Sequence, residues 1–389
     1  MRSIYFDNSA STVISEEALQ KYIEVSRESY GNPSSLHSMG VGAEGEIRLA
    51  KQRIKDSVGA KNFEVIFTSS GSEANNLAII GRALSKDRYL GKAKIITTMG
   101  EHASVNEPIL RLKSMGFKTV CLPTVGGVLD FDALIRELDE SVILLSVMMV
   151  NNETGAIYDL PRAAKELKKR CPDAMFHVDA TQGYMKLPFT MAGIGADMLT
   201  ISSHKIHGPK GVGALLISGE LIKTRGLAPI ILGGGQEKGL RSGTENVPGI
   251  AAFGEAVVTE QSLLTDSIKH MNELREGLIR RIRSKEELKE VQITDPTYHA
   301  PHILNLTLPR IKSETMLHYL NSLGIFVSSG SACSSNTGHL SDALTAFGKS
   351  AKEADSSIRI SFSRTNTIEE IDELVAGLCS GVKKLARMK

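Results

Sequence analysis

The sequence predicts an α/β fold with a largely parallel β-sheet that helices cover on both faces. Short runs of apolar, often β-branched residues recur through the first part of the chain, without the polar alternation of a half-exposed strand. Stretches with helical periodicity separate several of these runs, which favours strand–helix–strand units. The chain has 389 residues, too many for one ordinary hydrophobic core, so two domains are expected.

Strand and helix signals follow one another in the first part of the chain. Two amphipathic helices come first, at residues 19–30 and 47–58, and Gly59 ends the second. A third helix is predicted at residues 73–84, and a later one begins with Asp159 as its N-cap, shortly before a proline. The strands are predicted at residues 65–68, 95–98, 117–122, 142–150, 175–179, 198–201 and 212–217.

The pattern changes after residue 249, where helical periodicity extends from residue 252 to about residue 283. The last predicted helix opens with a capping box, Thr367 and Glu370, and carries an apolar stripe that would be core or a docking face. Strands are predicted between these helices at residues 303–308, 325–328 and 358–362. We expect a large α/β domain at residues 15–255 and a small α+β domain formed by residues 1–14 and 256–389.

Composition and charge exclude several classes of protein. With 41% hydrophobic and 23% charged residues the composition is that of an ordinary soluble protein, and a net charge of +2 gives no general attraction to nucleic acid or membranes. Neither a signal peptide nor a membrane-spanning run is indicated, so a cytoplasmic location is expected. The four cysteines form no Cys-x-x-Cys pair, so no metal site or disulfide framework is expected. Cys121, Cys171 and Cys379 are interpreted as small buried hydrophobic residues.

The turn at residues 202–211 lies between two predicted strands and holds Lys205 beside a histidine and two serines. A lysine that is desolvated there would be a nucleophile for carbonyl chemistry, although most such turns are simply solvated loops. Another apolar strand further upstream, at residues 175–179, delivers a carboxylate, Asp179. A lysine that traps an aldehyde and a carboxylate from a neighbouring strand are the pair that a pyridoxal 5'-phosphate (PLP) site needs.

Further polar residues follow the carboxyl ends of other predicted strands. Ser70 begins a Ser/Gly turn at a helix N-terminus, which is an anion-binding site or a plain capping turn. His102 could stack on a flat cofactor or move a proton, and Asn152 follows the strand at residues 142–150. Ligands of open α/β sheets bind at the carboxyl ends of strands, so these residues and Asp179 are expected to share one crevice.

Two residues in the C-terminal part break the structural pattern. Cys333 lies in a Ser/Gly-rich stretch that is too polar to bury it, so its thiol could be an exposed nucleophile. Arg359 is a charge inside an apolar strand, which suits either bidentate capture of a substrate carboxylate or a structural salt bridge.

Taken together, these segments resemble the signature blocks of the NifS/IscS-like cysteine desulfurases. These are PLP enzymes of the class V aminotransferase group, with the aspartate aminotransferase fold (PLP fold type I), so the same fold is expected here. The resemblance covers nearly the whole chain in the expected order. It rests on residues 5–12, 31–37, 68–76, 101–102, 150–155, 177–182, 202–213, 241–246, 328–335 and 357–359.

The resemblance implies a role for each candidate residue. Lys205 would hold PLP and shuttle protons, Asp179 would pair with the pyridine nitrogen, and Gln182 would bond the ring hydroxyl. His102 would stack on the ring and assist proton transfer. The remaining cofactor and substrate contacts would come from Gly71, Ser72, Ser202 and His204 at the phosphate, Thr244 at the phosphate of a partner subunit, and Asn152 and Arg359 at the substrate carboxylate.

The implied enzyme is a homodimeric sulfurtransferase that converts L-cysteine to L-alanine. Cys333 would take the sulfur as a persulfide and pass it to an acceptor protein, for iron-sulfur clusters or for thiolated tRNA and cofactors. Neither the acceptor nor the order of the Cys333 loop follows from the sequence. A selenocysteine lyase or another class V aminotransferase-fold enzyme is the alternative, and a non-catalytic scaffold is disfavoured by the presence of both Lys205 and Asp179.

Overall fold

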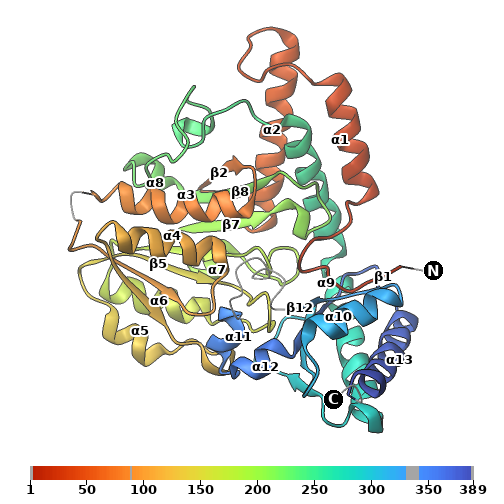
Figure 1. Cartoon of the computed structure of the whole chain (residues 1–389). Coiled ribbons are helices and arrows are strands. Elements are labelled where there is room, and N and C mark those ends of the chain that lie inside the picture. Colours follow the sequence, from red (N-terminus) through yellow and green to blue (C-terminus); the bar gives the residue numbers. More distant parts are fainter. Residues whose placement is uncertain (1–2, 88–89, 330–340, 387–389) are drawn as a thin grey trace.

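The computed structural model describes residues 3–87, 90–329 and 341–386 and contains a seven-stranded sheet in its larger part (Figure 1). The strand order is β2-β8-β7-β6-β5-β3-β4, and the β3–β4, β3–β5, β5–β6 and β6–β7 pairs are parallel. β8 runs antiparallel to both of its neighbours, so β2 again points the same way as β7. The strands are β2 Phe63–Thr68, β3 Lys94–Thr98, β4 Lys118–Leu122, β5 Val142–Met148, β6 Met175–Asp179, β7 Met198–Ser202 and β8 Gly213–Ser218.

Both faces of this sheet are buried, as the apolar strands predict. Alternate residues face opposite sides, so Ile66 packs into a cluster with α3 and α4, whereas Val65 packs into a larger cluster with α1, α2 and α9. The predicted α/β fold with its largely parallel sheet is thereby confirmed. The helices of this part are α1 Glu16–Glu28, α2 Ser38–Ser57, α3 Gly71–Leu84, α4 Ala103–Ser114, α5 Phe131–Glu137, α6 Leu160–Arg170, α7 Met191–Ile194 and α8 Gly219–Lys223.

A second hydrophobic core lies in the C-terminal part, which forms the lower right of Figure 1. It contains the antiparallel sheet β12-β13-β10-β9 and the short parallel pair β1–β11. The long helix α9 joins the two parts, because its first half packs on α1 and α2 and its second half on α13. The elements are β1 Ile4–Tyr5, α9 Val247–Ser284, β9 Gln292–Thr294, β10 Ile303–Thr307, α10 Ser313–Ser322, β11 Ile325–Phe326, β12 Ser328–Ser329, α11 Asp342–Phe347, α12 Ala351–Asp355, β13 Ser357–Ser361 and α13 Ile368–Leu385.

The capping predictions hold at both helices for which they were made. Asp159 accepts a hydrogen bond from the backbone N–H of Arg162 at the start of α6, and Thr367 and Glu370 form the capping box of α13. The apolar stripe of α13 belongs to the second core, with Ile371, Leu374 and their neighbours buried. The domain boundaries at residues 14/15 and 255/256 stay a prediction.

Three sequence expectations are wrong in detail. The strand predicted at residues 142–150 ends at Met148, because the chain then turns back and Val150 pairs with Ile157. The strand predicted at residues 325–328 is two short strands that belong to different sheets. Cys121 is exposed rather than buried, because β4 is an edge strand of the large sheet, whereas Cys171 is buried as expected and Cys379 is half-buried.

The expectation that no segment spans a membrane can be compared with the helices that the structure describes. Within residues 3–87, 90–329 and 341–386, none of them is both long and apolar enough to cross a bilayer.

Candidate active site

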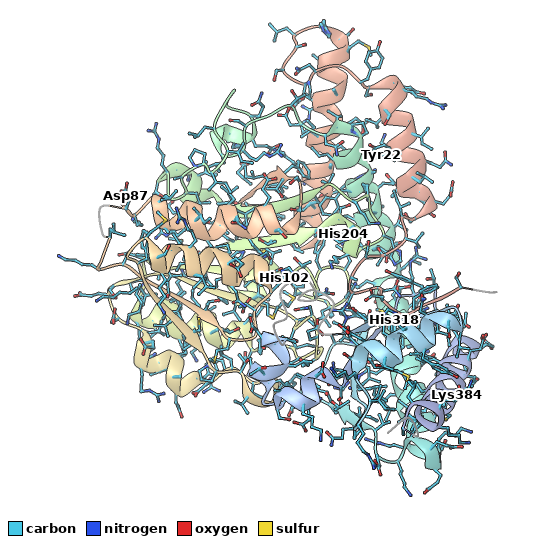
Figure 2. The ribbon with its side chains drawn as sticks, viewed as in Figure 1. Tyr22, Asp87, His102, His204, His318 and Lys384 are labelled. Carbon is cyan, nitrogen blue, oxygen red and sulfur yellow. The ribbon has the colours of Figure 1, made fainter. Side chains whose placement is uncertain are left out.

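A cavity of about 410 Å³ opens where the carboxyl ends of β2, β3, β5, β6 and β7 meet the C-terminal part of the chain. Two of its histidines, His102 and His204, lie near the centre of the molecule in Figure 2. The predicted coincidence at one sheet edge is therefore observed. Eleven of the residues singled out from the sequence line this cavity, namely Ser70, Gly71, Ser72, His102, Asn152, Asp179, Gln182, Ser202, His204, Lys205 and Arg359.

Lys205 ends a short 3-10 turn that follows β7 directly. Its ammonium donates to the backbone carbonyls of Ser9 (2.6 Å) and Ala10 (2.9 Å), which belong to the N-terminal segment between β1 and α1. Thr12 fixes this segment, because its N–H and its hydroxyl both donate to the carbonyl of His204. The N-terminal segment therefore holds the lysine amine at the mouth of the cavity.

Asp179 ends β6 with only 5% of its surface exposed. One carboxylate oxygen accepts from the backbone N–H of Thr181 (2.9 Å), and the other accepts from the side-chain amide of Asn75 (2.8 Å). A buried carboxylate held in this way can present negative charge to a cationic ring nitrogen in the same cavity.

An anion cradle is formed where β2 turns into α3. Ser70 caps the helix, and its hydroxyl accepts from the backbone N–H of Glu73, so the N-terminal amides of Gly71 and Ser72 lie at the positive end of the helix dipole. A Cβ atom on Gly71 would lie 3.3 Å from the Cβ of Ser202, which shows how closely β7 approaches this turn. The Ser202 hydroxyl is buried without a hydrogen-bond partner among the described residues.

His204 lies on the other side of this cradle, with Nδ1 3.2 Å from the hydroxyl of Ser11. Burial lowers the pKa of His204 to about 4, and the positive charges of Lys205, Lys210 and Lys186 act in the same direction. The cavity therefore holds a neutral imidazole that can donate one hydrogen bond to an anion.

His102 is the N-cap of α4, and its Nδ1 accepts from the backbone N–H of Ser104 (3.1 Å). Burial lowers the pKa of His102, and the nearby Lys205 and Arg359 lower it further, whereas Asp179 acts to raise it. The ring is therefore neutral at physiological pH and has Nε2 to offer to a ligand in the cavity.

Arg359 lies on β13 with 4% of its surface exposed and reaches the cavity from the C-terminal part. Its guanidinium donates to the Asp7 carboxylate (2.8 Å), to the Glu153 carboxylate (3.3 Å) and to the backbone carbonyl of Asn152 (3.0 Å). The structural salt bridge weighed in the sequence analysis is thus present, and the same side chain also lines the cavity.

Among the described residues, one predicted site residue is not brought to this cavity. Thr244 lines a separate cavity of about 220 Å³ beside Glu237 and Arg241. Cys333 lies outside the described residues.

A model of the family described as Aminotransferase class-V matches residues 4–374. The chain belongs to the class V aminotransferase family. The NifS/IcsS protein homolog of Lactobacillus delbrueckii subsp. bulgaricus is 39% identical over 96% of this chain and 95% of its own length. A cysteine desulfurase of Trichormus azollae is 37% identical over 99% of this chain and 94% of its own. The resemblance seen in the sequence motifs is thereby confirmed.

Solved structures agree with this family assignment. A NifS-like protein superposes with a TM-score of 0.90 at 33% identity and covers 99% of this chain and 100% of its own. A structure described as SspA in complex with cysteine superposes with a TM-score of 0.79 at 29% identity, over 94% of this chain and 100% of its own. These similar structures confirm the predicted PLP fold type I for this class V family member.

Several residues of the cavity in this class V family member were not predicted from its sequence. Asn75 donates hydrogen bonds to Asp179 and to Ser104. The carbonyls of Ser9 and Ala10 accept from Lys205. Helical spacing could have indicated Asn75, because it lies four residues after Gly71 on the same face of α3. The backbone carbonyls had no signal, because every residue type carries one.

Proposed function

We propose that this chain is a PLP-dependent cysteine desulfurase that converts L-cysteine to L-alanine and moves the sulfur to Cys333. The observation that carries the proposal is the single cavity that holds an amine, a buried carboxylate, an imidazole and a guanidinium, from Lys205, Asp179, His102 and Arg359. Relatives named cysteine desulfurase, at 36–37% identity over nearly the whole chain, give the substrate class.

The cavity fits PLP in three respects. The α3 N-terminus and neutral His204 would form a phosphate-binding site with the Ser202 hydroxyl, which has no hydrogen-bond partner among the described residues. Asp179 supplies the carboxylate for the pyridine nitrogen, and Lys205 the amine for the aldehyde. Gln182 has a buried side-chain oxygen without a partner among the described residues, so this oxygen can accept a hydrogen bond from the ring hydroxyl. When bound, PLP would supply the electron sink that makes cleavage at the substrate Cβ possible.

The chain's own residues would then bind substrate and move protons. Arg359 and Asn152 would bind the substrate carboxylate, which would compete with Asp7 and Glu153 for the guanidinium. The Lys205 amine, held by two carbonyls at the cavity mouth, would carry protons to and from the substrate carbons. His102 would stack on the ring and hold or move a proton at Nε2.

Sulfur transfer would balance through Cys333. Its thiolate would form an S–S bond to the substrate sulfur while the substrate C–S bond breaks. Two electrons would pass to the substrate Cβ, which would take a proton to give alanine, and both sulfur atoms would be oxidised to the persulfide level. L-cysteine and the protein thiol would thus give L-alanine and a protein persulfide, with no external oxidant or reductant.

The proposal extends to the assembly and the partners. We propose a homodimer in which Thr244 contacts the phosphate of the partner subunit, and two domains with boundaries at residues 14/15 and 255/256. A cytoplasmic location and an acceptor protein for the sulfur complete the proposal, with iron-sulfur clusters and thiolated products as the two candidate uses. A selenocysteine lyase is the second candidate function.

The test is product analysis with PLP-loaded protein. Alanine formed from L-cysteine, and lost in Lys205→Ala together with borohydride trapping of PLP on the protein, would support the desulfurase. Alanine formed from L-selenocysteine but not from L-cysteine would make the protein a selenocysteine lyase. Amino-group transfer to an oxo acid, without loss of sulfur, would contradict both and make it an aminotransferase.

A further inference from the structure

Asn75 lies between Asp179 and Ser104, and Ser104 in turn contacts His102. The Asn75 side chain is buried, with 1% of the residue exposed, and its amide nitrogen donates both of its hydrogens. One goes to the Asp179 carboxylate (2.8 Å) and the other to the Ser104 hydroxyl (2.8 Å). The Ser104 hydroxyl in turn lies 2.8 Å from Nδ1 of His102.

The direction of each hydrogen bond in this series is fixed by the groups at its two ends, the Asp179 carboxylate and the Ser104 backbone N–H. An ionised Asp179 can only accept, so the amide of Asn75 must turn its NH₂ group toward it. The second N–H then points at the Ser104 oxygen, which must accept. The backbone N–H of Ser104 can only donate, so Nδ1 of His102 must accept it, and the Ser104 hydroxyl, which lies 2.8 Å from the same nitrogen, must donate to it as well. With Nδ1 accepting twice, a neutral His102 carries its proton on Nε2.

We propose that Asn75 and Ser104 are positioning residues that link the orientation of the Asp179 carboxylate to the tautomer of His102. Its consequence for catalysis rests on the proposed function, in which Asp179 would pair with the ring nitrogen and His102 would stack on the ring of the same cofactor. The link itself belongs to the protein without cofactor. This link keeps Nε2 of His102 protonated, so that this nitrogen is a donor toward the cavity.

Replacing the amide of Asn75 by a carboxyl group should reverse the hydrogen bond between residue 75 and the Ser104 hydroxyl. In Asn75→Asp the side chain needs donors, so the Ser104 hydroxyl turns toward residue 75 and no longer donates to His102. Loss of that donor removes a stabilising contact of the neutral ring, so His102 should bind its second proton at higher pH, by about half to one pH unit. The charged groups that face His102 are Asp179, Lys205 and Arg359. The new carboxyl group beside Asp179 adds negative charge near the ring, which also raises the pKa of His102, so the double variant is needed to separate the two effects.

The experiment is an NMR titration of the cofactor-free protein with ¹⁵N-labelled histidine, in which His102 is assigned by its loss in His102→Asn. The expected wild-type result is a proton on Nε2. Ser104→Ala should raise the titration midpoint as Asn75→Asp does, and Ser104→Thr should restore it. Ser114→Ala is the matched control, because Ser114 ends the same helix and its hydroxyl only bonds the carbonyl of Arg111.

The double variant decides the route of the effect. If Asn75 acts through the Ser104 hydroxyl, Asn75→Asp should raise the titration midpoint less in the Ser104→Ala background than in wild type, because only the effect of its charge remains there. Additive shifts, or a wild-type His102 that carries its proton on Nδ1, would overturn the link. Because neither cofactor nor substrate is present, absent desulfurase activity would contradict only the proposed function.

Discussion

Glu101 is a buried acid directly before His102, with 3% of its surface exposed. One carboxyl oxygen accepts from the Thr98 hydroxyl (2.7 Å) and from the backbone N–H of Met148 (2.9 Å), and the other has no partner among the described residues. Burial raises the pKa of Glu101 to about 8, and the negative charge of Asp179 adds to the rise. Glu101 is therefore protonated at neutral pH.

The sign of its contribution to stability follows from that shift. Because the pKa rises from 4.5 in the unfolded chain to about 8 in the folded protein, Glu101 destabilises the fold progressively as pH rises between these values. Glu101→Gln keeps the accepting oxygen and removes the ionisation. Its free energy of unfolding relative to wild type should grow by about 1.4 kcal/mol per pH unit between pH 4.5 and 8 and stay constant above.

Denaturant unfolding of both proteins from pH 5 to 9 measures this difference, and it removes the contributions of other titrating groups that both share. Glu107→Gln is the control, because Glu107 is exposed on α4, the helix that follows Glu101. A difference that does not change with pH would show that Glu101 is ionised in the fold.

At the scale of residues, the sequence predicted side chains better than contacts. Asp179 and Lys205 could be predicted because Asp179 ends one apolar strand and Lys205 lies in the turn after another, and both strand ends face the cavity. The carbonyl contacts of Lys205 could not, because the N-terminal segment reaches it across nearly 200 residues of chain. For Arg359 the ion pair is observed, and capture of the substrate carboxylate stays a prediction.

At the scale of elements, β8 and α3 meet without space for a side chain. A Cβ atom on Gly213, the first residue of β8, would lie 2.4 Å from the carbonyl carbon of Ser70, so Gly213→Ala must displace the turn before α3. We expect a loss of about 1–3 kcal/mol in the free energy of unfolding. PLP affinity should fall as well, because the displaced turn carries the proposed phosphate-binding amides.

The matched control is Gly42→Ala on α2, where a Cβ atom meets nothing within 4 Å. That change should stabilise the protein by up to about 1 kcal/mol and leave PLP affinity unchanged. Denaturant unfolding and a PLP titration measure both variants. Wild-type PLP affinity in Gly213→Ala would contradict the assignment of this turn to the phosphate.

Element boundaries were less predictable than element types. The helix predicted to start at residue 47 begins at Ser38, because His37 caps it and the glycines at 40, 42 and 45 weaken the helical signal. The division of residues 325–328 between two sheets depends on β1 and β13, which come from opposite ends of the chain. Such long-range pairing has no local signal in the sequence.

At the scale of the whole molecule, Thr244 is the residue that tests the dimer. It lines a cavity away from Lys205 in its own chain, so it can serve the proposed site only across an interface. Mixed dimers of Lys205→Ala and Thr244→Ala chains would then contain one site with both residues intact. With random assembly, about a quarter of all sites should regain wild-type PLP affinity and activity.

Co-expression of the two chains with different affinity tags, followed by purification through both tags, isolates the mixed dimer. The two parent homodimers are the controls. A mixed dimer no more active than its parents would mean that Thr244 acts within its own chain or not at all.

The most direct test of the central claim is a single turnover of the PLP-loaded protein with L-cysteine, comparing wild type with Cys333→Ala. We predict one alanine and one protein persulfide per site in wild type. In Cys333→Ala we predict bound PLP, with neither persulfide nor alanine above background. Alanine and sulfide released equally by both proteins would contradict sulfur transfer through Cys333, and no alanine from either would contradict desulfuration itself.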